Sequence, residues 1–141
     1  MEEIERSIEV EATLEQLDYV MGLLEEILEE AGCPMKNSML IAVSVEELYV
    51  NVVSYAYTPN IGNCKIRVHA KCEEEHGSVR IELRDKGVPF NPWLREDPDT
   101  TLSAEERQIG GLGIFMTKKN MDRYDYQYAD GENIVTIEKD W

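Results

Sequence analysis

Basic residues are scarce in this chain. Its 141 residues include 14 Lys and Arg against 29 Asp and Glu, which gives a formal net charge of −15. Binding to a DNA or RNA backbone needs a basic face that releases counterions, so this balance argues against nucleic acid as a direct ligand. It equally disfavours a polybasic anchor on anionic lipid. Two classes of partner are therefore excluded by composition.

Cysteines and long apolar runs are also few. The three cysteines are odd in number and form no CxxC pair, so we expect reduced thiols in a cytosolic protein rather than a disulfide framework or a zinc site. No apolar run is expected to reach the length of a membrane span. Five glutamates occupy residues 1–12, where a signal peptide would carry a basic start and an apolar stretch. The predicted location is the cytoplasm, with no membrane segment.

Apolar residues, in contrast, are sufficient for a core. They make up 43% of the sequence, which argues against disorder. The length suits one domain, and we find no repeat, linker or low-complexity tract. We therefore expect a single domain over residues 1–141.

Periodicity predicts an α+β fold. Alternation predicts a first strand over residues 4–10, and Thr13 followed by Gln16 forms a capping-box pattern that predicts a helix start. That helix should end at Gly32 and Pro34. The further predicted elements are a helix over residues 36–56, strands around 64–70 and 79–83, a helix over 112–122, and a hairpin of 124–129 and 132–139. This order predicts helices on one face of a largely antiparallel sheet.

The second predicted helix carries a narrow polar row on an otherwise apolar surface. The row consists of Ser44, Glu47, Asn51 and Ser54, spaced i, i+3, i+7 and i+10. A carboxylate on so apolar a helix is costly to bury without a partner. Glu47 and Asn51 are i, i+4 neighbours and can reach one bound object together. The alternative is an exposed polar stripe on an ordinary surface helix.

Periodicity disappears over residues 85–113, which hold three of the five prolines and four of the nine glycines. Such long irregular stretches are usually functional. Asp85 follows a strand and precedes Gly87, so it can present a carboxylate to a ligand or simply bond the backbone of a tight turn. Residues 110–113 read Gly-Gly-Leu-Gly and open into a helix. Free amides there can receive phosphate, although a flexible hinge has the same composition.

These three motifs, in this order, resemble those of the GHKL superfamily, the gyrase, chaperone, histidine-kinase and mismatch-repair ATPases of the Bergerat fold. Within it the chain resembles the bacterial anti-sigma-factor serine kinases. Val45–Asn51 is similar to their N box, Asp85–Phe90 to their adenine box, and Glu105–Asp122 to their lid and second glycine box. The likeness covers essentially the whole chain. It implies a two-layer sandwich, with three helices on one face of a mixed, mostly antiparallel sheet.

The resemblance also implies a site for ATP and Mg²⁺. Glu47 would be the general base or water-positioning carboxylate toward an incoming hydroxyl. Asn51 would ligate Mg²⁺, which would also contact the triphosphate. Asp85 would accept a hydrogen bond from the adenine amino group, with Gly87 letting the base lie against the backbone. The other implied nucleotide contacts are Phe90, Gly111, Leu112, Gly113 and Thr136.

Two positions depart from the family's pattern. Tyr55 stands four residues after Asn51, where sporulation-type members usually have histidine. The family's late Gly-Thr pair appears as Gly131-Glu132-Asn133, with Thr136 further on. Lys118 and Lys119 follow the glycine motif on the same predicted helix. The sequence leaves two interpretations of them open: contact with phosphate, or a position on a solvated helix face.

By resemblance, the leading function is an ATP-dependent serine/threonine protein kinase that binds a sigma factor. Its substrate would be a serine of a small STAS-type anti-anti-sigma protein, and a homodimer is expected on the same ground. The alternatives are a non-catalytic ATP-binding regulatory module, a stand-alone histidine-kinase-like ATPase domain, and an α+β domain without nucleotide.

Overall fold

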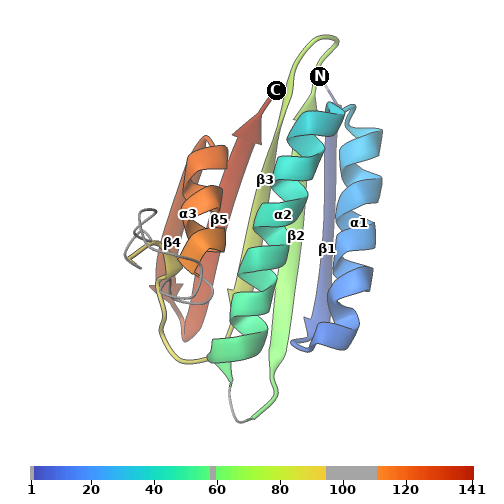
Figure 1. Cartoon of the computed structure of the whole chain (residues 1–141). Coiled ribbons are helices and arrows are strands. Elements are labelled where there is room, and N and C mark those ends of the chain that lie inside the picture. The colour runs from blue at the N-terminus through green and yellow to red at the C-terminus, as the bar shows by residue number, and fades with distance from the viewer. Residues whose placement is uncertain (1, 58–59, 95–110) are drawn as a thin grey trace.

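The computed structural model describes residues 2–57, 60–94 and 111–141 (Figure 1). The elements confirm the predicted order. They are β1 (Glu2–Glu11), a 3₁₀ turn (Leu14–Gln16), α1 (Leu17–Glu30), α2 (Met35–Asn51), a π-helical turn (Val52–Ala56), β2 (Asn63–Cys72), β3 (Gly77–Asp85), a second 3₁₀ turn (Pro92–Leu94), α3 (Gly111–Asn120), β4 (Arg123–Ala129) and β5 (Glu132–Asp140).

The five strands form one sheet in the order β1-β2-β3-β5-β4. All four neighbouring pairs are antiparallel, so the described strands include none of the parallel pairs that a mixed sheet would contain. After β3 the chain passes through α3 to the edge strand β4 and returns as β5 beside β3 (Figure 1). The β4–β5 turn has positive φ at Asp130 (54°) and Gly131 (79°), as a type I′ turn requires.

The three helices cover one face of the sheet, with α2 between α1 and α3 (Figure 1). Alternate residues of β2 and β3 point into the layer between helices and sheet, and their neighbours are exposed or partly exposed. The largest fully buried side chains are Tyr49, Leu24, Ile27, Leu28, Ile41, Ile66, Ile81, Leu83, Ile114 and Ile137. The cysteines Cys33, Cys64 and Cys72 are free, in agreement with the sequence-based expectation.

The helical run through α2 corrects one prediction. Met35–Ala56 spans 22 residues and contains an 18-residue window with a mean hydropathy of 1.3, long and apolar enough by length and composition to cross a membrane. The expectation that no run reaches that length is therefore wrong. In the fold, however, α2 lies along the sheet, and Ile41, Val45 and Tyr49 are completely buried against it. The central helix of a folded domain is apolar for this reason.

The start of α1 corrects a second prediction. The Thr13 side chain makes no capping hydrogen bond, and the helix begins through a 3₁₀ turn. Instead, the Thr13 carbonyl oxygen accepts hydrogen bonds from the Gln16 amide (3.2 Å) and from the Tyr49 hydroxyl (2.7 Å). The Gln16 amide thus bonds the Thr13 carbonyl in place of the Thr13 side chain, and Tyr49 of α2 adds a tertiary contact to the same carbonyl.

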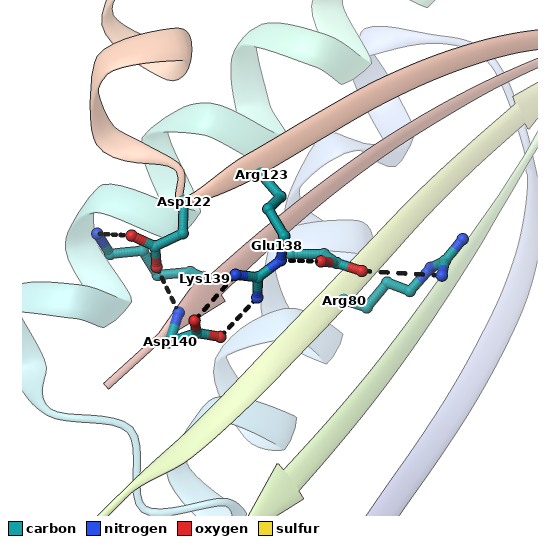
Figure 2. Close-up of polar contacts among 6 residues, drawn as sticks. All are labelled: Arg80, Asp122, Arg123, Glu138, Lys139 and Asp140. Atoms are coloured by element: carbon teal, nitrogen blue, oxygen red, sulfur yellow. Dashed lines mark hydrogen bonds and ion pairs between the residues drawn. The ribbon is translucent and has the colours of Figure 1, made fainter.

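Charged side chains pair across the other face of the sheet, and Figure 2 shows the densest group. Arg123 donates to both carboxylate oxygens of Asp140, at 2.7 and 3.1 Å, and also to Glu138. Glu138 lies 3.7 Å from Arg80 on β3. Asp122 accepts from the Asp140 amide at 2.7 Å. The Arg123 guanidinium lowers the pKa of the Asp140 carboxyl below its ordinary value.

Candidate nucleotide site

A cavity lies where the end of α2 meets the ends of β3 and β5 on the helix-covered face. Much of its wall is apolar, formed by Leu48, Val52, Ala56, Leu83, Val88 and Val135. Three polar side chains enter it from three different elements: Asn51, Asp85 and Asn133. A mostly apolar pocket with a few convergent polar groups is the usual form of a small-molecule site.

Asp85 and Asn133 form the polar end of this cavity. They are direct cross-strand partners at the ends of β3 and β5, and their exposed fractions are only 5% and 3%. Asp85 Oδ1 accepts hydrogen bonds from Asn133 Nδ2 and from the Gly87 amide, both at 2.9 Å. Because both bonds end on Oδ1, the geometry holds the buried carboxylate in one orientation. Both interpretations of Asp85 therefore apply: its carboxylate accepts a hydrogen bond from the backbone of the turn, and it also lines a cavity.

Asn133 also fixes the segment after β3. Its Nδ2 donates to the Val88 carbonyl at 2.9 Å, and its Oδ1 accepts from the Phe90 amide at 3.0 Å. The Tyr126 hydroxyl donates to the same Oδ1. Burial raises the pKa of Tyr126, which keeps that hydroxyl protonated as a donor. A single buried amide therefore connects β3, β4, β5 and the loop.

Gly87 is needed for a close approach of two backbones. A β-carbon at this position would lie 2.6 Å from Ala56 Cβ and closer still to the Ala56 carbonyl group. The Val88 amide donates to that Ala56 carbonyl at 2.9 Å. The Asp-Lys-Gly turn therefore packs directly on the π-helical turn that ends α2. Such π-turns are frequent at functional sites.

Tyr55 on the π-helical turn and Phe90 on the loop stand at the cavity mouth. Both line the cavity, their ring centroids are 6.0 Å apart, and their exposed fractions are 47% and 40%. Two partly exposed aromatic rings at the mouth of an apolar pocket suit a flat aromatic ligand. The structure thus brings Tyr55, whose role was open, to the same cavity as Phe90.

Asn51 is the polar residue of α2 in this cavity. It is 9% exposed, and among the described residues its Nδ2 has no hydrogen-bond partner. An unsatisfied buried amide costs free energy, which a bound ligand with an acceptor oxygen would recover. No group of three or more His, Cys, Asp and Glu side chains among the described residues could hold a metal by itself. Asn51 also offers a side-chain oxygen, and oxygen is the ligand atom that Mg²⁺ prefers.

Glu47 lies one turn before Asn51 and meets the glycine motif. A β-carbon on Gly113, in the first turn of α3, would lie 2.6 Å from Glu47 Cγ and closer still to its carboxyl group. The polar row of α2 thus faces α3, and its first residue, Ser44, is 1% exposed. The alternative of a wholly exposed polar stripe is wrong, because α3 covers part of the row.

The structure does not bring Thr136 to the cavity. Asn133, Val135 and Ile137 point toward the helices, so Thr136 points to the opposite face, where it lies beside Arg80, Arg123 and Glu138. The reason is the two-residue period of a strand. Gly111 begins α3, but the side chain of Leu112 and residues 105–110 of the expected lid lie outside the described residues. Lys119 places its ammonium 4.7 Å from the Phe115 ring centre, on an exposed helix face.

Asn133 is the site residue that the sequence analysis missed. The available signal was its phase in β5, since an Asn that alternates with Val135 and Ile137 occupies an inward position. A buried amide at such a position requires hydrogen-bond partners. Its pairing with Asp85 depends on β5 lying next to β3, which the local pattern does not determine.

Comparisons with known proteins agree with this geometry. A curated relative, the serine/threonine-protein kinase BtrW of Bordetella bronchiseptica, is 23% identical over 131 residues, which is 93% of this chain and 90% of that protein. The crystal structure of the RsbU and RsbW domains of Rv1364c from Mycobacterium tuberculosis aligns with 96% of this chain at a TM-score of 0.64 and 20% identity. The chain spans 32% of that larger structure, and the likeness is one of fold. The profile of the histidine kinase-like ATPase domain matches residues 10–139, so the chain belongs to that family.

Proposed function

We propose that this protein binds ATP together with Mg²⁺ in the cavity between α2, β3 and β5. The observation that carries the proposal is the meeting of Asn51, Asp85 and Asn133 in one cavity, with Glu47 one helical turn away. In this proposal Asp85 accepts a hydrogen bond from the adenine amino group through Oδ2, because both of its protein hydrogen bonds end on Oδ1. Gly87, Phe90 and Tyr55 then border the base.

The phosphate end of the proposed site lies toward α3. Asn51, whose Nδ2 has no hydrogen-bond partner among the described residues, and the first turn of α3, which begins at Gly111, would contact the phosphates. The positive end of a helix favours negative charge, and Mg²⁺ on Asn51 Oδ1 would add the positive field that an acidic chain otherwise lacks. Leu112 and Gly113 complete the proposed contacts. Thr136 is left out because it lies on the other face of the sheet.

We further propose serine/threonine protein kinase activity. The substrate hydroxyl oxygen would attack the γ-phosphorus of bound ATP, the bond from that phosphorus to the bridging oxygen would break, and ADP would leave. Glu47 would hold the hydroxyl and accept its proton. The relative from Bordetella bronchiseptica, named a serine/threonine-protein kinase, supports this assignment over nearly the whole chain. General-base assistance of this kind contributes about 10²–10⁴-fold to a rate.

The proposed partners follow from the same relationship. The chain would bind a sigma factor and phosphorylate a STAS-type anti-anti-sigma protein, as a homodimer in the cytoplasm. The net charge of −15 favours direct contact with basic surfaces of the sigma-factor protein and disfavours contact with DNA.

The test is transfer of labelled phosphate from ATP to STAS proteins of the same genome. The expected result is labelling of one candidate. In Glu47→Ala the rate of labelling should fall at least about 100-fold, while the affinity for ATP is retained. Glu46→Ala is the matched control, because Glu46 is exposed on another side of α2. Transfer that survives Glu47→Ala unchanged would overturn the base assignment. ATP binding without transfer to any candidate would instead favour a non-catalytic regulatory module.

A further inference from the structure

The first turn of α3 packs on the carboxyl group of Glu47. A β-carbon at Gly113 would overlap that group, since it would lie 2.6 Å from Glu47 Cγ and nearer to the carboxyl atoms. In folded proteins such short separations essentially never occur between a β-carbon and another heavy atom. The volume that a side chain at position 113 would need is therefore occupied by Glu47.

Gly113 cannot easily move away from Glu47. Its carbonyl oxygen accepts a hydrogen bond of 2.9 Å from the Thr117 hydroxyl, and Thr117 is 1% exposed. The next residue, Ile114, is 2% exposed and belongs to the hydrophobic core. Position 113 is thus held by the buried residues that follow it in α3, and a larger residue there would displace the flexible Glu47 side chain rather than α3.

We infer that Gly113 is a positioning residue for Glu47: its missing side chain leaves the space in which α3 holds the carboxylate beside Asn51. This inference rests on the proposed role of Glu47 as the base. It assigns Gly113 a function besides any backbone contact with phosphate, and it makes the position of the base depend on that of α3. A misplacement of about 1 Å in a reacting group can lower a rate about 100-fold.

Two matched substitutions separate this role from general helix effects. Gly113→Ala fills the space occupied by Glu47, whereas Gly22→Ala in the middle of α1 meets nothing within 4 Å. Alanine stabilises a helix interior relative to glycine, so Gly22→Ala should raise Tm by about 3 °C. Gly113→Ala should give a similar rise only in the Glu47→Ala background, and little rise or a decrease when Glu47 is present. An equal Tm change in both backgrounds would overturn the inference.

The Tm comparison does not depend on catalysis, so it tests the contact even if the chain transfers no phosphate. In the active protein, Gly113→Ala should lower phosphoryl transfer at saturating ATP by about 100-fold, and Gly22→Ala should leave it unchanged. Glu47→Asp should lower the rate in the parent chain. In the Gly113→Ala background it should recover part of the rate, because the shorter side chain clears the new methyl group. The same fractional loss in both backgrounds would contradict the positioning role.

Discussion

Asn133 donates hydrogen bonds of 2.9 Å to both the Asp85 carboxylate and the Val88 carbonyl, so one residue of β5 holds the end of β3 and the loop that follows it. The Phe90 amide and the Tyr126 hydroxyl both donate to its Oδ1. These partners define which end of the amide faces the carboxylate. The orientation of Asp85 is therefore set from a strand that is distant in the sequence.

Replacing Asn133 should affect stability and ligand binding together. Asn133→Ala removes one of the two donors to the buried Asp85 carboxylate and the donor to the Val88 carbonyl, and it leaves the Phe90 amide without its acceptor. We expect a loss of about 1–3 kcal/mol in the free energy of unfolding. Weaker ATP binding should accompany it. Urea denaturation and titration calorimetry would measure the two effects. The control is Asn63→Ala, which removes an exposed side-chain amide that donates to Glu9 and should cost less than about 0.5 kcal/mol. Similar losses in both variants would contradict the assigned role.

Asp85→Asn tests the adenine contact. The variant keeps the shape of the side chain, and its oxygen can still accept from Gly87 and Asn133, so the fold should persist. The proposed acceptor for the adenine amino group becomes a donor, and ATP affinity should fall at least about 10-fold, consistent with about 1.5–3 kcal/mol for a hydrogen bond to a charged group. Binding assays with ATP and GTP should also show reduced discrimination. Thr136→Val, on the opposite face, should leave ATP affinity unchanged.

ATP binding should depend strongly on Mg²⁺. Chelation of the metal should weaken ATP binding at least about 10-fold in the parent chain, because in the proposed site Asn51 would hold Mg²⁺ together with the nucleotide. Asn51→Ala should bind ATP weakly with or without metal. The same variant should not lower the stability of the nucleotide-free protein, because it removes a buried Nδ2 that has no hydrogen-bond partner among the described residues. Equal ATP affinity of the parent chain in Mg²⁺ and in chelator would contradict the assignment.

The ion pairs of Figure 2 should make stability depend on pH. Arg123 lowers the pKa of Asp140 from its ordinary value of 3.8. The stabilisation is therefore fully present above pH 3.8 and is lost as the pH falls through the lower value of the folded protein. Arg123→Gln should lower Tm at pH 6 and low salt, and lower it less at pH 2 or in high salt, since both groups are half exposed. A Tm difference that is independent of pH would contradict this.

The fold could be predicted largely from local patterns. Apolar residues that alternate with a period of two predict the strands of the two hairpins, and apolar residues with a period of 3.6 predict α1 and α2. The Asp130-Gly131 turn was identified because few residues other than glycine, asparagine and aspartate adopt positive φ. The capping box at Thr13 is absent because the Gln16 amide, which the box would pair with the Thr13 side chain, donates to the Thr13 carbonyl in a 3₁₀ turn.

The site residues divide in the same way. Glu47, Asn51 and Asp85 stood out because carboxylates and amides on apolar segments need partners, and the order of the motifs related them to a family. Asn133 and Thr136 could not be distinguished by residue type, since both are polar and lie three residues apart on one strand.

The sequence alone predicts the strands and helices, the type of turn between β4 and β5, and the candidate acidic and amide groups of the site. All of these depend on residues within a few positions of one another. The fold was needed to decide that β5 lies beside β3, that Asn133 and not Thr136 enters the cavity, and that Glu47 meets Gly113. These relationships depend on strand order, strand phase and helix packing. Each of the three joins segments that are far apart along the chain.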